Sequence, residues 1–97
     1  MTNSPSMTPG HRVMTLEQIA LIEKVRALGI AIEGVLNEVA DRHRTQRTAS
    51  EEFGEAADDL ADHITVAQPE RWLAMARTDL QCGLMKLTRA VAQPEFF

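Results

Sequence analysis

Two long stretches of this chain carry apolar residues at steps of three, four and seven, and this helical period constrains the fold more than any other feature. The first stretch begins at Thr15, where Gln18 stands at capping-box spacing, and continues to about Asp41. Its apolar stripe consists of Ile19, Ile22, Val25, Ile32, Leu36 and Val39. We predict one long amphipathic helix over this stretch.

The second stretch is bounded by prolines. Pro69 suits the first position of a helix, and Pro94 closes the stretch. Its stripe consists of Leu73, Ala76, Leu80, Gly83, Leu87 and Ala90. Between the two stretches, the polar segment 41–50 ends in Ser50, a suitable N-cap for a short acidic helix through Phe53, Ala56, Ala57 and Leu60. We therefore predict an all-α fold, an antiparallel helical hairpin with a short extra helix.

The first ten residues, "MTNSPSMTPG", have no apolar period and contain two prolines and a glycine. We expect residues 1–10 to form a flexible N-terminal arm and residues 11–97 to form a single helical hairpin domain. No apolar run approaches the roughly 20 residues that span a bilayer, and the first residues lack the pattern of a signal peptide. A cytoplasmic protein without a membrane partner is expected.

A hairpin of two helices covers only one stripe of each helix, yet both long helices carry apolar residues outside that stripe. These residues are Leu21, Leu28, Val35, Trp72, Leu84 and Val91. A second copy of the chain is the simplest partner for them, so we expect a homo-oligomer. Glycines inside the helices, each costing roughly 1 kcal/mol relative to alanine, favour close approach by a helix or a ligand: Gly29, Gly34 and Gly83.

Residues for catalysis or metal binding are scarce. The three histidines, His11, His43 and His63, lack the spacing of paired ligands, and Cys82 is the single cysteine. The carboxylates between Glu51 and Asp62 fit the solvated face of the short helix better than an acid and base pair. We expect no metal site, no cofactor and no enzymatic activity. A net charge of −4 also argues against binding to duplex nucleic acid.

Arginine accounts for eight of the ten basic residues. Its planar guanidinium binds phosphate in a bidentate manner and stacks on bases, which favours an anionic ligand. Arginines on a helix also pair commonly with neighbouring carboxylates, so composition alone leaves both roles open. The eight residues are Arg12, Arg26, Arg42, Arg44, Arg47, Arg71, Arg77 and Arg89.

The segments "MTLEQIALIEKVRALG" and "PERWLAMARTDLQCGLMKLTRAVAQP" resemble the small phage-encoded anti-CBASS sponges, whose hairpin domain also occurs in anti-Thoeris sponges. The likeness covers about residues 10–94, and its most specific part is R-W-L-A-x-A-R-T with the later G-x-M-x-L-x-R-A. The resemblance implies an all-helical hexamer, built as a trimer of dimers. It further implies a protein that binds cyclic di- and trinucleotide signals of bacterial immunity and does not cleave them.

The same resemblance implies a cyclic dinucleotide site. The aromatic position that stacks on a base falls on His11, where the family usually has tyrosine, and the basic position of the first long helix falls on Arg26. Arg12, next to His11 in "GHRVMT", is included in this site. Other roles stay open, because His11 could be only the end of the arm, and Arg26 could pair with Glu23 or Glu33.

A separate site for cyclic trinucleotides is expected on the third helix, where Arg71, Arg77 and Thr78 are candidates for a ring of phosphate-binding groups around a symmetry axis. Arg71 and Arg77 do not share one helix face, because six residues turn the helix by about 600°. Only one of the two arginines is therefore expected at the centre. Alternatively, Arg77 pairs with Asp79, or with Glu70 of a neighbouring subunit.

Three hypotheses for function follow. The first, which we favour, is a non-catalytic sponge for cyclic nucleotides. The second is an oligomeric helical adaptor that binds another protein through Trp72 and the remaining exposed apolar residues. The third, a phosphodiesterase, is disfavoured because neither metal ligands nor an acid and base pair can be assembled. The sequence leaves open which bases are preferred, whether cyclic ADP-ribose isomers bind and which host system is countered.

Overall fold

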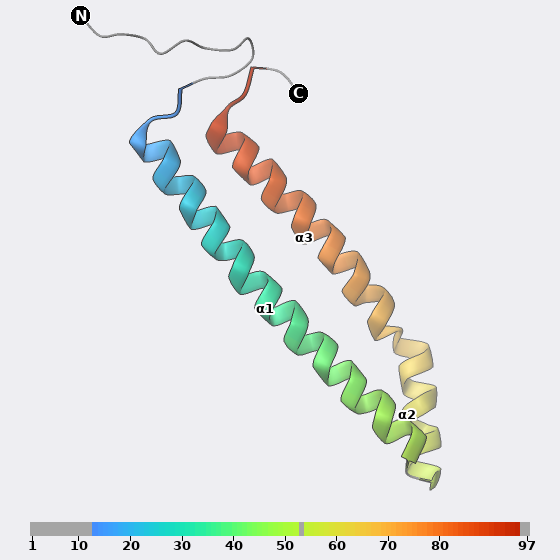
Figure 1. The fold of residues 1–97 in the computed structure, drawn as a ribbon. Helices are drawn as coiled ribbons and strands as arrows, with labels where there is room; N and C mark the ends of the chain where they lie inside the picture. The colour runs from blue at the N-terminus through green and yellow to red at the C-terminus, as the bar shows by residue number, and fades with distance from the viewer. Residues whose placement is uncertain (1–12, 53, 96–97) are drawn as a thin grey trace, which may run out of the picture. The chain divides into compact units, whose positions relative to one another are not determined.

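The structure, a computed structural model, describes residues 13–52 and 54–95, which form three α-helices (Figure 1). Helix α1 spans Leu16–Glu52, α2 spans Gly54–Ala67 and α3 spans Pro69–Ala92. No strand occurs in these two ranges, which confirms the predicted all-α class. None of the three helices, over the same ranges, combines the length and apolarity needed to cross a bilayer. The described chain divides into two compact units, residues 13–30 with 81–95, and Ala31–Leu80.

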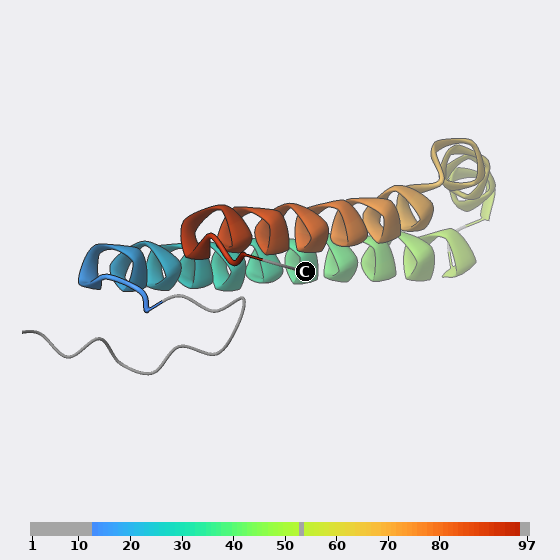
Figure 2. The same cartoon turned by 90° about the horizontal axis from the view of Figure 1, so that it is seen from above.

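In the first unit, the first turns of α1 run antiparallel to the last turns of α3, side by side in both views (Figures 1 and 2). The predicted capping box is present: the Gln18 backbone N–H donates to the Thr15 hydroxyl at 3.1 Å, and the Thr15 N–H donates to Gln18 Oε1 at 2.8 Å. Gln18 Nε2 also donates to the Val91 carbonyl at 3.0 Å. One glutamine thus caps α1 and joins its start to the end of α3.

The inner face of α3 differs from the predicted stripe. Leu84 and Val91, expected to lie off the stripe, are half-buried, whereas Gly83, Leu87 and Ala90 are exposed. From Leu73 onward, successive inward positions are on average about 3.6 residues apart, which is one helical turn. Successive positions of the predicted stripe were on average closer together than this. With each turn, the predicted stripe therefore rotated further away from the face that is in fact turned inward. The α3 residues with reduced exposure are Pro69, Leu73, Ala76, Arg77, Leu84, Thr88, Val91 and Ala92.

The second unit contains the rest of α1, all of α2 and the beginning of α3. The prediction that the first helix ends near Asp41 is wrong, because α1 continues without interruption to Glu52. Three hydroxyls in this polar segment, those of Thr45, Thr48 and Ser50, donate to helix carbonyls three or four residues earlier. Ser50 is therefore inside α1 and does not cap a second helix.

Residues with positive φ mark the helix junctions. Gly54 opens α2 at a φ of 47°, in the left-handed region that glycine adopts without a steric penalty. Gln68 has a φ of 50°; its N–H donates to the Ile64 carbonyl at the end of α2, and its carbonyl accepts from the Trp72 N–H in the first turn of α3. Pro69 begins α3, as predicted.

Few side chains are removed from solvent. Among the described residues, the buried apolar side chains are Leu36, which is 8% exposed, and Ala57, which is 5% exposed, and both lie in the second unit. Large apolar side chains remain exposed on both long helices, as predicted for Leu21, Leu28 and Val35, and Trp72 is 61% exposed. Within the described residues, neither unit therefore holds a closed hydrophobic core of its own.

Candidate functional site

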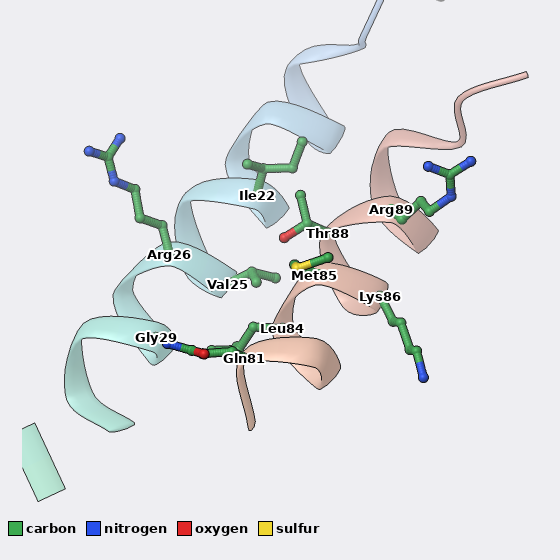
Figure 3. A pocket seen from close by; sticks show the side chains of 10 residues that line it. All are labelled: Ile22, Val25, Arg26, Gly29, Gln81, Leu84, Met85, Lys86, Thr88 and Arg89. Atoms are coloured by element: carbon green, nitrogen blue, oxygen red, sulfur yellow. The ribbon is translucent and has the colours of Figure 1, made fainter. Parts of the chain in front are cut away.

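An open groove of about 860 Å³ lies in the first unit, between the first half of α1 and the last turns of α3 (Figure 3). Its floor is mainly apolar and its edges are basic. The residues that line it are Ile22, Val25, Arg26 and Gly29 of α1, with Gln81, Leu84, Met85, Lys86, Thr88 and Arg89 of α3.

Helical spacing explains how these side chains come to one surface. On α1 the lining positions are 22, 25, 26 and 29, and on α3 they include 81, 84, 85 and 88, so each set lies within two turns on one face. Gly29 faces α3 across the groove, and a Cβ at this position would lie 3.4 Å from Leu84 Cδ1, at the border of ordinary van der Waals contact. A larger side chain at position 29 would occupy the floor of the groove.

The charge of the groove is opposite to that of the whole chain. Three cations line it, Arg26, Lys86 and Arg89, and none of the described residues that line it is acidic, although the chain carries a net charge of −4. Arg26 forms no ion pair within residues 13–52 and 54–95, so neither Glu23 nor Glu33 holds its guanidinium there. The groove is therefore a local site of positive potential that can attract an anion.

The basic side chains extend from opposite edges of the groove. In Figure 3, Arg26 leaves α1 on the side away from α3, while Lys86 leaves α3 on the side away from α1. The side chains of Val25, Met85 and Thr88 lie between them. A ligand that fits this arrangement has negative charge toward its edges and an apolar or aromatic middle.

Of the residues predicted to bind ligand, the structure places only Arg26 in this groove. His11 and Arg12 lie outside the described residues. The three predicted for a trinucleotide site, Arg71, Arg77 and Thr78, lie on the part of α3 that belongs to the second unit. The described residues thus present two separate sets of candidates.

Arg71 and Thr78 share a face of α3, because seven residues correspond to nearly two full turns. Both are exposed, and Arg71 Nη1 donates to Gln68 Oε1 at 3.1 Å, which orients the guanidinium. Arg77 is half-buried on a different face, so the three candidates do not form one cluster within the chain. Glu70, considered above as a partner of Arg77 in a neighbouring subunit, pairs with Arg47 of α1 in the same chain.

Lys86, Arg89 and Met85 were not predicted as part of a site. The stripe predicted for α3 used an average spacing below about 3.6 residues, so it excluded Leu84. The prediction therefore missed that the α3 residues around Leu84 line the same groove as Arg26 of α1. A step of 3.6 residues from Leu73 would have identified that face.

Among the described residues, the remaining titratable side chains do not assemble into a second centre. His43 Nδ1 is buried and has no hydrogen-bond partner in the described structure. Within the described ranges, no three side chains of the His, Cys, Asp or Glu types gather as metal ligands would. The groove therefore remains the best candidate site, and its groups are suited to binding an anion.

Comparison with known proteins identifies a phage relative of this chain. No family model matches it. It is 31% identical over 106 aligned residues to Anti-CBASS protein 2 of Pseudomonas phage JBD67, and the alignment covers 98% of both chains. The likeness thus extends over almost the whole length and confirms the family that the two helical segments predicted. The chain belongs to the family of Anti-CBASS protein 2.

Proposed function

We propose that this protein binds and sequesters cyclic di- and trinucleotides, without cleaving them, and so antagonises CBASS antiphage defence. The observation that carries the proposal is the groove with Arg26 on its edge: its described lining is basic and apolar and contains no acidic residue, in a chain that is acidic overall. The name of the phage relative, Anti-CBASS protein 2, supports CBASS as the target.

A cyclic dinucleotide suits this groove chemically. It carries two phosphate charges and two flat bases, so it needs cationic donors together with surfaces on which rings can lie. The guanidinium of Arg26 can donate two parallel hydrogen bonds to one phosphate. Met85 and Val25 provide the apolar surface, and a thioether makes favourable contacts with aromatic rings. His11, four residues before the capping box, is proposed to stack on a base.

The proposed active form is a homo-oligomer, and the family resemblance favours a hexamer. Support comes from the scarcity of buried side chains, since Leu36 and Ala57 are the buried apolar residues of the described ranges. The groove is also open to solvent on one side, so a second copy that covers it would desolvate the ligand and strengthen its ionic hydrogen bonds.

For cyclic trinucleotides we propose a second site on α3, with Arg71 or Arg77 as the central cation and Thr78 as an additional donor. The exposed pair Arg71 and Thr78 supports Arg71 for this role, because the two share one face of the helix. Three copies of one arginine around a three-fold axis repel each other, and a ligand with three phosphates would neutralise them.

Competition calorimetry tests both sites. The protein saturated with a cyclic dinucleotide is expected to bind a cyclic trinucleotide with unchanged affinity. Arg71→Ala or Arg77→Ala should weaken only the trinucleotide. Full mutual exclusion of the two ligands would show that a single site serves both.

A second candidate function is that of a protein–protein adaptor, which the 61% exposure of Trp72 favours. One experiment distinguishes the two functions. An adaptor binds neither cyclic nucleotide in the same calorimetric experiment, whereas a sponge binds at least the dinucleotide.

A further inference from the structure

The edge of the groove opposite Arg26 carries Lys86 and Arg89, one turn apart on α3. Neither residue was assigned a role by the sequence or by the family resemblance. Lys86 is exposed, and its side chain extends away from α1, whereas that of Arg26 extends away from α3 (Figure 3). The two cations therefore flank the apolar floor from two different helices.

This arrangement restricts how a dianion can lie in the groove. A single phosphate can be met at one edge only, which leaves the cation on the other edge without an anionic ligand group. A ligand with two phosphates that lies across the floor can satisfy both edges, and it places its rings over Met85 and Val25. The absence of acidic side chains from the described lining means that no carboxylate there competes with the second phosphate.

We propose that a cyclic dinucleotide lies across the groove, with one phosphate on Arg26 of α1 and the second phosphate on Lys86 of α3. This inference rests on the proposed sponge function and extends it by assigning the second phosphate to a residue of another helix. The contact with Lys86 is a charge-assisted hydrogen bond from the ammonium to a phosphate oxygen, and it lacks the bidentate geometry available to Arg26.

The chain has two lysines, and this provides a matched control. Lys24 is exposed on α1 but does not line the groove. We would measure the affinity of the full-length protein for a cyclic dinucleotide with one guanine and one adenine, at low and at physiological salt. Lys86→Gln is expected to weaken binding about 5- to 10-fold and to reduce its dependence on salt, whereas Lys24→Gln should stay within about twofold of the parent.

A double-mutant cycle shows whether Arg26 and Lys86 contact two different phosphates or the same one. If Arg26 and Lys86 meet different phosphates, the losses from Arg26→Gln and Lys86→Gln should add in the double variant. Strong non-additivity would show that both act on the same phosphate and would overturn the assignment. Lys86→Arg keeps the charge and should retain most of the affinity, which separates loss of charge from damage to the fold.

The outcomes also distinguish this inference from the function on which it rests. No dinucleotide binding by the parent protein would remove the proposed function and this inference together. Binding by the parent that Arg26→Gln weakens, but that Lys86→Gln affects no more than Lys24→Gln does, would leave the function standing and overturn the role of Lys86.

Discussion

At the scale of single residues, Arg26 is the side chain on which the dinucleotide site depends most. Replacement by alanine removes the guanidinium that is proposed to meet a phosphate, and the expected loss is about 1.5 to 3 kcal/mol of binding free energy. Calorimetry checks this, with Arg42→Ala as the control, because Arg42 is an exposed arginine of α1 that does not line the groove. Equal affinities of the two variants would count against the site.

His11 is the second residue of the proposed dinucleotide site. If its ring stacks on a base, His11→Ala should cost about 1 to 3 kcal/mol, while His11→Tyr, which restores the usual residue of the family, should bind at least as tightly as the parent. The same titration measures both variants. Parental affinity of His11→Ala, in an unchanged oligomer, would show that no stacking occurs there.

The residues of the site were only partly predictable from the sequence. Arg26 followed from the family resemblance, and the structure places it on a groove. Lys86 and Met85 were missed, because their position depends on how α3 is rotated relative to α1 in the first unit. A small error in the helical step, accumulated over several turns, is enough to change which side chains face the groove.

At the scale of helices, local chemistry predicted the starts of α1 and α3 correctly, whereas the N-cap predicted at Ser50 was wrong. The Thr15 and Gln18 capping box and the N-terminal Pro69 both act through backbone groups within one turn of their own position. The predicted end of the first helix was wrong. The segment after Asp41 has little apolar period, so it was predicted to lie outside the helix, yet it remains helical to Glu52. Within the second unit the ion pair between Arg47 and Glu70 joins this segment to α3.

Gly34 gives a helix-scale test of assembly. It lies inside α1, and no atom of the described chain would be within 4 Å of a Cβ at this position. In a monomer, Gly34→Ala should therefore stabilise the helix by roughly 1 kcal/mol. We expect instead that the variant weakens the proposed oligomer, because we propose that a partner's helix approaches this backbone. Light scattering and thermal unfolding measure the two effects, and a more stable variant with unchanged assembly would contradict the close approach.

At the scale of the whole molecule, a stable monomer is difficult to reconcile with the exposure of its apolar side chains. Conformational entropy opposes folding by an amount that burial must offset, and the described residues bury little. We predict a homo-oligomer at micromolar concentration, and the family resemblance implies six chains. Light scattering in physiological salt decides this; a folded monomer would contradict the proposal that a second copy of the chain covers the groove.

The fold class was predictable because a helical period can be read from the sequence of a single chain. Assembly was not predictable in the same way, because it depends on surfaces of two different chains. The exposed residues Leu21, Leu28 and Val35 predict a partner surface but not its geometry. In the same way, the cations of the groove indicate an anionic ligand, but the bases that it carries depend on contacts that a second copy would supply.

We propose above that the protein binds cyclic nucleotides and releases them chemically unchanged. The most direct test is to incubate it with a cyclic dinucleotide, remove unbound ligand, denature the complex by heat and analyse what is released by chromatography. We predict that the intact dinucleotide is recovered in proportion to the protein. Recovery of linear or mononucleotide products would show an enzyme, and absence of bound ligand would show that the groove does not serve this function.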